Sequence, residues 1–292
     1  MSGGAVVGGV ETGGTRTRCV IGTGPEDVRA ETSVPTTTPA ETLGRAADFF
    51  RTHAERVAAV GIASFGPIDL DERSPTFGWV TTTPKPGWAR ADVVGAFRGL
   101  SVPVAFDTDV NGAALGEHRW GAGRGVDPFV YVTVGTGIGG GAIVHGRPLH
   151  GLVHPEMGHL AIPRDPADRF AGACPYHGGC LEGLASAVAL RARWGAAAET
   201  LPAGHEAWPL QARYLALGVV AITAVLSPQR IALGGGVMRA AGLLERVRHE
   251  VAVALAGYVR APELVAPALG DRAGALGGLA LAQGALARGS VQ

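Results

Sequence analysis

The feature that most constrains the fold is a pattern that occurs twice in the chain: an apolar strand, a turn of glycine and threonine, and a second strand. The first turn is Thr12-Gly13-Gly14-Thr15, and the second is Gly135-Thr136-Gly137, about 120 residues later. Self-similarity at this distance predicts two related halves. The four flanking strands are predicted at residues 5–11, 16–22, 129–134 and 140–144.

Helices and strands alternate through the rest of the chain, which is typical of an α/β architecture with mostly central sheets. No low-complexity linker separates the halves, so we expect two domains closely joined around a cleft. The other helices are predicted near 40–55, 110–120, 181–194, 209–226, 240–257 and 273–288. The other strands are predicted near 28–35, 57–64, 102–109, 230–234 and 263–267.

The composition of the 292-residue chain narrows the functional class. Hydrophobic residues make up 47% and charged residues 17%, so the chain can bury a large core and is not expected to be disordered. Basic and acidic residues both number 25, and this zero net charge disfavours a nucleic-acid partner. Lys85 is the only lysine, which we attribute to compositional bias rather than to function.

The sequence predicts a cytoplasmic protein with no membrane partner. The first residues show no basic segment followed by an apolar stretch, so no signal peptide is expected. The longest apolar stretch, residues 216–226, is shorter than the roughly 20 residues that cross a bilayer. Three cysteines are too few for a disulfide framework, and Cys19 on its strand is most simply a core residue.

The two glycine turns are candidate phosphate-binding loops. Glycine lets the backbone approach a ligand closely, and successive N–H groups form a concave anion site. Glu11 directly precedes the first turn and can hold Mg²⁺ through a water. The alternative is that both are ordinary hairpin turns.

Two other glycine patterns need separate interpretation. Gly135, Gly137 and Gly140 fit the dinucleotide-binding pattern G-x-G-x-x-G, but that pattern must open a helix, and here a short strand follows. An NAD site is therefore rejected. Gly234-Gly235-Gly236 follows a strand and precedes a helix, so it is either a plain turn or a contact to a nucleotide base.

A candidate catalytic base lies in Asp107-Thr108-Asp109-Val110-Asn111, where a buried strand meets a helix. Ligands of α/β sheets bind at the carboxyl ends of strands. Each of these side chains could instead cap the helix, but two aspartates and an asparagine exceed what one cap requires. An aspartate here could accept a proton from a sugar hydroxyl during phosphoryl transfer.

The most specific local signal is a set of metal-ligand side chains. His159, Cys174, His177 and Cys180 form a Cys₂His₂ set, with two residues between successive members of the last three. This set suits tetrahedral zinc with no open position, so we predict a structural zinc ion; the alternative is a buried cysteine pair beside an incidental histidine.

Two carboxylates flank the predicted metal ligands. Glu156 and Glu182 would be fixed beside them, where both could accept hydrogen bonds from sugar hydroxyls. His154 would exceed four ligands and is expected near the metal ligands as a supporting residue or at the surface.

Taken in order, these segments resemble the ROK family of sugar kinases, repressors and related proteins, over nearly the whole chain. The resemblance is strongest to its zinc-containing bacterial fructokinase members. It is carried by four stretches: Glu11-Thr-Gly-Gly-Thr15, Thr83-Pro-Lys-Pro-Gly-Trp88, Asp107-Thr-Asp-Val-Asn111, and Pro155-Glu-Met-Gly-His159 with Cys174-Pro-Tyr-His177-Gly-Gly-Cys180-Leu-Glu-Gly.

The resemblance implies an actin-like, ribonuclease-H-like fold of two domains, with ATP, Mg²⁺ and sugar meeting in the cleft. We expect an N-terminal domain at residues 1–112, with a C-terminal helix at about 273–292 packing back on it, and a C-terminal domain at 113–272. The resemblance implies Asp109 as the base. The implied sugar contacts are Asn111, Glu156, His159 and Glu182. The implied nucleotide and magnesium contacts are Glu11, Gly13, Gly14, Thr15, Gly135, Thr136, Gly137, Gly234, Gly235 and Gly236.

This chain departs from common family patterns at three places. Glu11 stands where many members carry Asp, and His177 stands where common zinc sets have Cys, a replacement that the fructokinase-like members share. Glucose-type members usually carry Glu-Asn-Asp where this chain has Asp107-Thr108-Asp109, which argues against a glucokinase. Repressor members carry an N-terminal helix-turn-helix, for which the early first strand leaves no room.

The expected activity is ATP-dependent phosphorylation of the 6-hydroxyl of fructose, with ATP, Mg²⁺ and structural Zn²⁺. The resemblance also implies a homodimer. One alternative is a kinase for mannose, glucose or an N-acylhexosamine, since backbone glycines do not select the sugar. Another is a sugar-responsive binding protein without catalysis.

Overall fold

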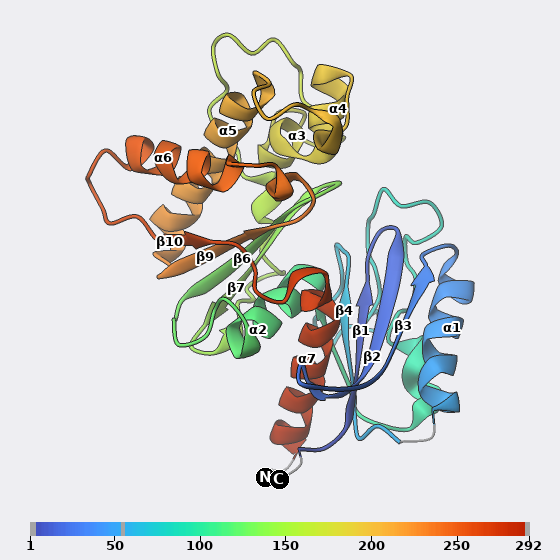
Figure 1. The fold of residues 1–292 in the computed structure, drawn as a ribbon. Helices are drawn as coiled ribbons and strands as arrows, with labels where there is room; N and C mark the ends of the chain where they lie inside the picture. The colour runs from blue at the N-terminus through green and yellow to red at the C-terminus, as the bar shows by residue number, and fades with distance from the viewer. Residues whose placement is uncertain (1–3, 54–55, 290–292) are drawn as a thin grey trace. The chain divides into compact units, whose positions relative to one another are not determined.

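The computed structural model describes residues 4–53 and 56–289, which form two compact units (Figure 1). Unit 1 combines the N-terminal part, Met1–Arg124, with Arg147–His154 and Leu269–Gln292. Unit 2 comprises Gly125–Gly146 and Pro155–Ala268. Residues 1–3, 54–55 and 290–292 lie outside the described part. The predicted N-terminal domain, 1–112 with 273–292, includes these residues.

Unit 1 is built on a five-stranded sheet of order β3-β2-β1-β4-β5. The hairpin of β1 and β2 is antiparallel, β3 continues it, and β4 and β5 lie parallel to β1. Every residue of the interior strand β4 is buried, whereas β3 alternates between half-buried and exposed positions, as expected for an edge strand. The strands are β1 (Val7–Thr12), β2 (Arg16–Gly24), β3 (Asp27–Pro35), β4 (Val60–Ser64) and β5 (Val104–Thr108).

Helices α1 (Pro39–Thr52) and α7 (Ala273–Gly289) cover opposite faces of this sheet (Figure 1). Successive residues of a strand point to opposite faces. A Cβ on Gly8 would meet the Phe50 ring of α1, and one on Gly9 would meet the Ala275 carbonyl of α7. Thr38 caps α1 by accepting from the Glu41 amide. The helix ends before the predicted residue 55, and its last two predicted residues lie outside the described part.

Helix α7 approaches α2 (Asp109–Trp120) and the sheet with backbone against backbone. A Cβ on Gly277 would lie 1.9 Å from the Gly112 oxygen, and one on Gly61 of β4 would lie 2.0 Å from the Gly278 oxygen. No side chain fits in either place, so the glycines of the three elements allow this approach.

Unit 2 contains most of a second five-stranded sheet, of order β10-β9-β6-β7-β8. Its β6 and β7 form an antiparallel hairpin, and β9 and β10 continue in parallel from β6, so the two sheets share one topology. Two α/β units whose sheets share one topology are what the predicted two-domain actin-like fold requires. The strands are β6 (Phe129–Val134), β7 (Ile138–Val144), β8 (Arg147–Pro148), β9 (Arg230–Gly234) and β10 (Glu263–Val265).

The helices of unit 2 differ from the sequence expectation by a few residues in their bounds and, at one point, in their number. The single helix predicted at 181–194 is two helices, because Ser186 adopts an extended conformation and its side chain caps the second helix at the Ala189 amide. The helices are α3 (Leu181–Ala185), α4 (Ala187–Trp194), α5 (Ala207–Leu226) and α6 (Leu243–Leu255). Short 3₁₀ turns are η1 (Gly95–Leu100), η2 (Met157–His159), η3 (Ala198–Thr200), η4 (Val237–Arg239) and η5 (Gly270–Arg272).

Helix α5 is longer than the apolar stretch seen in the sequence. By length and composition it is the one helix among the described residues that could cross a membrane, with a mean hydropathy of 1.5 over 18 residues. Half of that window is buried within the protein, where α5 packs against α6 and α3. This is also the pattern of a core helix.

The close contact of α7 predicts opposite effects for two glycines of the same helix. Gly277→Ala should lower the free energy of unfolding by about 1–3 kcal/mol or more, because the methyl group would meet the Gly112 backbone. Gly284→Ala should leave stability unchanged or raise it by up to about 1 kcal/mol, because only the Arg288 side chain is nearby and alanine favours the helix. Thermal unfolding midpoints measure both, and equal midpoints would contradict the backbone contact.

Candidate functional site

The predicted site residues of unit 1 lie where β1 and β5 end. Glu11 is the second-last residue of β1, and Asp109 is the first residue of α2, directly after β5. Thr108 is the helix cap, since its hydroxyl accepts from the Asn111 amide at 3.1 Å. Asp109 is therefore not needed as a cap: its Oδ1 accepts from the adjacent Val110 amide at 2.9 Å, and no side chain in the described part donates to it.

Burial makes the carboxylates of this part unusually basic. It raises the pKa of Asp109 to about 6 and is the main cause that raises the pKa of Glu11 to about 7. The Arg18 guanidinium, 3.5 Å from Glu11, opposes that shift, and the negative charges of Asp109 and Asp271 add to it. Desolvated carboxylates of like charge are the kind of oxygen ligands that a divalent cation would stabilise.

A buried hydrogen-bond network fixes the neighbouring Asp107. Its Oδ1 accepts from the Thr108 amide at 2.8 Å and from the Asn111 side-chain amide at 2.7 Å, and its Oδ2 lies 3.0 Å from His150 Nε2. The bond to Asp107 raises the pKa of His150. Asp107 is thus fully engaged, which leaves Asp109 as the carboxylate that could serve as a base.

Sequence reasoning missed His150. It lies in the segment 147–154, outside the stretches that carry a motif, and only the fold brings it to Asp107 and Asn111. Asn111 itself is 1% exposed, and its side-chain oxygen has no hydrogen-bond partner among the described residues. The protein therefore leaves the acceptor capacity of this buried amide oxygen unused.

The position of His154 corrects one expectation. His154 is buried in unit 1, and its Nε2 accepts a hydrogen bond from the Ile68 amide at 3.2 Å. It is therefore a structural residue, and the expected surface position is wrong.

The first glycine turn also belongs to unit 1 and is closed by the Gly13 amide, which donates to the Arg16 carbonyl at 2.9 Å.

Unit 2 has its own group of predicted site residues, which includes the second glycine turn, between β6 and β7. The Gly135 amide donates to the Gly137 carbonyl at 2.9 Å, and the Gly135 carbonyl accepts from the Ala187 amide at 2.8 Å. Glu182 of α3 accepts from the Ile138 amide at 2.9 Å. A Cβ on Gly137 would lie 2.4 Å from that carboxylate, so Glu182 lies directly against the turn.

The third glycine cluster lies beside the second turn. Strands β6 and β9 are parallel, with Thr133 opposite Gly234, so both turns leave the same edge of the sheet. Gly235 has φ +91°, and a Cβ there would lie 2.4 Å from the Val134 carbonyl. The cluster is thus a strand-to-η4 turn, which still leaves Gly236 with open space around it.

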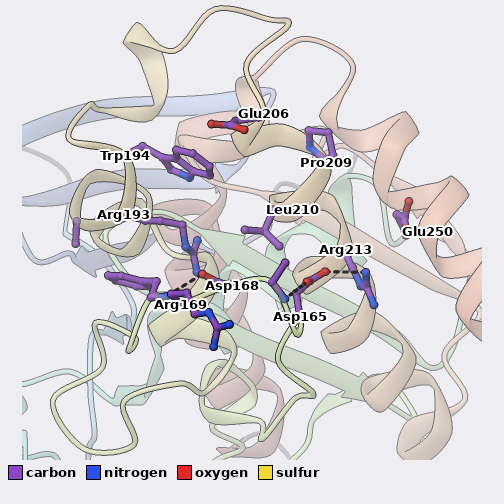
Figure 2. Close-up of a pocket in the computed structure, with 13 residues that line it drawn as sticks. Asp165, Asp168, Arg169, Arg193, Trp194, Glu206, Pro209, Leu210, Arg213 and Glu250 are labelled. Carbon is purple, nitrogen blue, oxygen red and sulfur yellow. Dashed lines mark hydrogen bonds and ion pairs between the residues drawn. The ribbon is translucent and has the colours of Figure 1, made fainter.

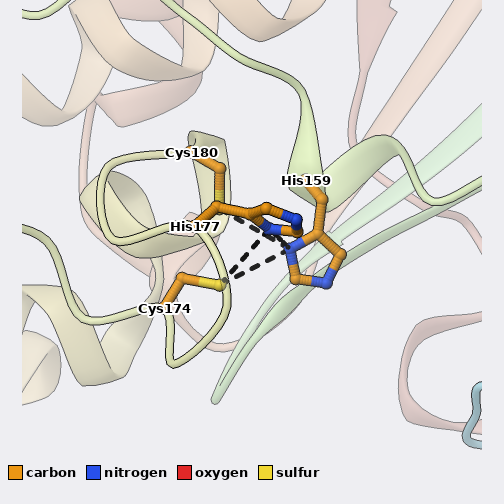
Figure 3. Close-up of side chains that lie close together, drawn as sticks. All are labelled: His159, Cys174, His177 and Cys180. Carbon is orange, nitrogen blue, oxygen red and sulfur yellow. Dashed lines mark hydrogen bonds between the residues drawn. The ribbon is translucent and has the colours of Figure 1, made fainter.

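The four predicted metal ligands lie together, with their ligand atoms within 4.8 Å of one another (Figure 3). His159 Nδ1 is 3.3 Å from His177 Nδ1, 3.7 Å from Cys174 Sγ and 3.6 Å from Cys180 Sγ. Tetrahedral zinc, with bonds of about 2.1 Å to nitrogen and 2.3 Å to sulfur, requires ligand separations of roughly 3.3–3.8 Å. The donor set therefore fits a tetrahedral zinc ion.

Glu156, the other glutamate predicted near the metal ligands, lies at the start of the segment that carries His159. Glu156 precedes η2, which carries His159, and is exposed. A Cβ on Gly158 of η2 would lie 1.8 Å from the Ile138 carbonyl oxygen, so the His159 segment packs directly on the second glycine turn. Unit 2 thus brings together the second and third glycine clusters, Glu182 and the metal ligands.

A cavity of about 740 Å³ in unit 2 contains none of the predicted site residues (Figure 2). Two ion pairs line it, Asp168–Arg193 at 3.0 Å and Asp165–Arg213 at 2.7 Å. The Asp168–Arg193 pair is almost fully buried and is reinforced by the Tyr214 hydroxyl, which donates to Asp168. These pairs connect the loop at 165–170 to α4 and α5, which is a structural role.

Comparison with known proteins matches residues 7–285 to the ROK family. The fructokinase of Zymomonas mobilis subsp. mobilis is 48% identical over 95% of this chain and 96% of its own, and that of Pediococcus pentosaceus is 41% identical over 96% and 99%. The structure is similar to the ROK hexokinase from Thermus thermophilus (TM-score 0.81, 29% identity, 97% and 99% of the two chains). It is also similar to a ROK family glucokinase from Streptomyces griseus in complex with glucose and AMPPNP (TM-score 0.76, 26% identity, 96% and 99%).

Proposed function

The chain belongs to the ROK family, and we propose that it is an ATP-dependent fructokinase that phosphorylates the 6-hydroxyl of D-fructose. The observation that carries this proposal is the 41–48% identity to fructokinases over nearly the full length of both chains. The arrangement of carboxylates and glycine turns in each unit is the kind that phosphoryl transfer to an alcohol requires.

In this mechanism Asp109 accepts the proton of the attacking hydroxyl. A base is most effective when its pKa approaches the working pH, and burial brings the pKa of Asp109 to about 6. Asp109 is then largely ionised at neutral pH and more basic than an exposed aspartate. Asp107 stays hydrogen-bonded and keeps Asn111 and His150 in place.

The glycine turns supply amides to the phosphates of ATP. The proposed nucleotide contacts are Gly13, Gly14, Thr15, Gly135, Thr136, Gly137, Gly234, Gly235 and Gly236. Glu11 would hold Mg²⁺ through water, and the bound ion would supply positive charge beside the phosphates. Preorganised amides stabilise the charge that develops in the transition state.

The sugar hydroxyls would contact Asn111, Glu156, His159 and Glu182. The Asn111 side-chain oxygen lacks a partner, and Glu182 uses one carboxylate oxygen for the Ile138 amide, so both retain acceptor capacity. His159, Cys174, His177 and Cys180 would hold a structural zinc ion that fixes the segment carrying Glu156 and His159.

We further propose two domains, one at residues 1–112 with 273–292 and the other at 113–272. We also propose a cytoplasmic location, a homodimeric state, and no membrane or nucleic-acid partner.

A coupled assay with ATP and Mg²⁺ tests the activity across fructose, mannose, glucose and an N-acylated mannosamine. We expect the largest kcat/KM for fructose. A larger value for any aldose would replace the fructose assignment by another hexose. Sugar binding without ATP turnover would overturn the kinase assignment in favour of a regulatory sugar-binding protein.

Replacing the proposed base should abolish most of the turnover. Asp109→Asn should lower kcat by roughly 10²–10⁴ without unfolding the protein. Asp71→Asn, which changes an exposed carboxylate of the same unit, is the control and should leave kcat unchanged. Near-normal turnover of Asp109→Asn would remove this residue from the mechanism.

The raised pKa of Asp109 also predicts the acid limb of the pH profile. The base acts only when ionised, so activity is present above its pKa and lost as the pH falls through about 6. An aspartate with an ordinary pKa would keep activity down to about pH 4. The profile of kcat/KM against pH measures this limb, and a limb near pH 4 would contradict the burial effect.

The metal set predicts about one zinc ion per chain by elemental analysis. Cys174→Ala should lose the metal and lower fructose affinity and the thermal midpoint, because the segment carrying His159 is no longer fixed. Cys19→Ala, which changes a buried cysteine on β2 outside the predicted metal set, is the control and should retain the zinc ion. A metal-free protein with unchanged fructose affinity would contradict the proposed role.

A further inference from the structure

The single lysine of the chain occupies a specific position. Of the 25 basic residues, 24 are arginine and only Lys85 is lysine. An ammonium is compact and carries three tetrahedral donors, whereas a guanidinium is a planar fork with five. Compositional bias explains the many arginines, but it does not explain why this one position carries lysine. The contacts of Lys85 revise the expectation that it has no function.

Lys85 contacts the first glycine turn directly. Its Nζ donates to the Gly14 carbonyl at 2.6 Å and lies 3.3 Å from the Thr36 carbonyl. These two oxygens belong to the turn between β1 and β2 and to the segment after β3. Two of the three ammonium N–H groups are thereby used, and one remains for a ligand.

No counter-ion neutralises this ammonium. Across residues 4–53 and 56–289, no carboxylate pairs with Lys85, and its partners are neutral carbonyls. The ammonium covers the Gly14 oxygen, which would otherwise repel an anion. The Gly13 amide is used by the Arg16 carbonyl, whereas the Gly14 amide donates to no protein acceptor among the described residues. The charge balance of the turn therefore favours an anionic ligand.

The loop that carries Lys85 is held in place independently. Trp88 is fully buried, its indole N–H donates to the Thr37 carbonyl at 2.7 Å, and its ring packs edge-on against Phe65 at 5.0 Å. The Lys85 amide itself lies 3.3 Å from the Thr83 hydroxyl. The ammonium is thus positioned before any ligand arrives, which lowers the entropy cost of binding.

We propose that Lys85 is a phosphate-binding residue: its free N–H contacts the polyphosphate of ATP at the first glycine turn, while its other donors hold the Gly14 and Thr36 carbonyls. The proposal rests on the function proposed above, in that it takes the turn to bind ATP. It requires the geometry of an ammonium and not merely a positive charge.

Calorimetric titration of the sugar-free protein with ATP, ADP and AMP, each with Mg²⁺, tests the contact. Lys85→Met should weaken ATP binding by about tenfold to a hundredfold, as for a lost hydrogen bond to a charged group. The loss should shrink from ATP through ADP to AMP, and fructose affinity should stay within about twofold, since the contact is to phosphates. Lys85→Arg should follow the same order with a smaller loss.

Arg73→Met is the matched control, because it removes one positive charge from an exposed side chain of the same unit. It should bind ATP, ADP and AMP as the wild type does. Thermal midpoints show whether each variant is folded, and Lys85→Arg carries the test alone if Lys85→Met does not fold.

Three results would overturn the proposal. The first is unchanged ATP affinity in folded Lys85→Met, and the second is an equal loss for ATP, ADP, AMP and fructose, which indicates a purely structural role. The third is wild-type ATP affinity in Lys85→Arg, which would show that charge alone suffices. If the wild type binds ATP but phosphorylates no hexose, the proposed function is refuted, and the Lys85 contact can still be measured. If the wild type phosphorylates fructose normally and Lys85→Met binds ATP with unchanged affinity, only the contact is refuted.

Discussion

The arrangement of unit 1 depends on the backbone contact between α7 and the elements it covers. Glycines on α7, β4 and α2 remove the side chains that would hold these elements apart, and α7 comes from the far end of the chain. The same approach shapes the candidate site, because a Cβ on Gly274 would lie 2.4 Å from the Glu11 carboxyl carbon. The close packing therefore both completes the core and encloses Glu11.

Enclosure explains the electrostatics of this site. A carboxylate removed from water loses hydration that the protein replaces only in part, so its protonated form gains in relative stability. Glu11 has one distant guanidinium partner, and Asp109 has a single backbone donor, whereas Asp107 is surrounded by donors. Two aspartates separated by one residue thus differ through their hydrogen bonds: Asp107 is fixed in a network, and Asp109 accepts from no side chain among the described residues.

The strands, most helices and the clustering of the two cysteines and two histidines were predictable because each leaves a local pattern. The strand–turn–strand repeat predicted both sheets, and the spacing of Cys174, His177 and Cys180 predicted a group that the fold does bring together. The contacts of His150 and Lys85 were not predictable, because they join segments 43 and 71 residues apart with no periodic signal. The break at Ser186 was missed because apolar helical spacing continues across it, and the domain boundaries stay predictions.

In unit 2 the metal ligands and the second glycine turn form one structural entity. His159 follows Gly158, which packs on the Ile138 carbonyl, and Cys180 precedes Glu182, which accepts from the Ile138 amide. Both ends of the segment that carries the predicted metal ligands therefore contact Ile138, the residue directly after Gly137: one end contacts its carbonyl and the other its amide. A metal that fixes this segment must also restrict the turn, because any shift of His159 or Cys180 moves a group that contacts Ile138. A metal ion held by these four side chains would therefore also restrain the second glycine turn through Ile138.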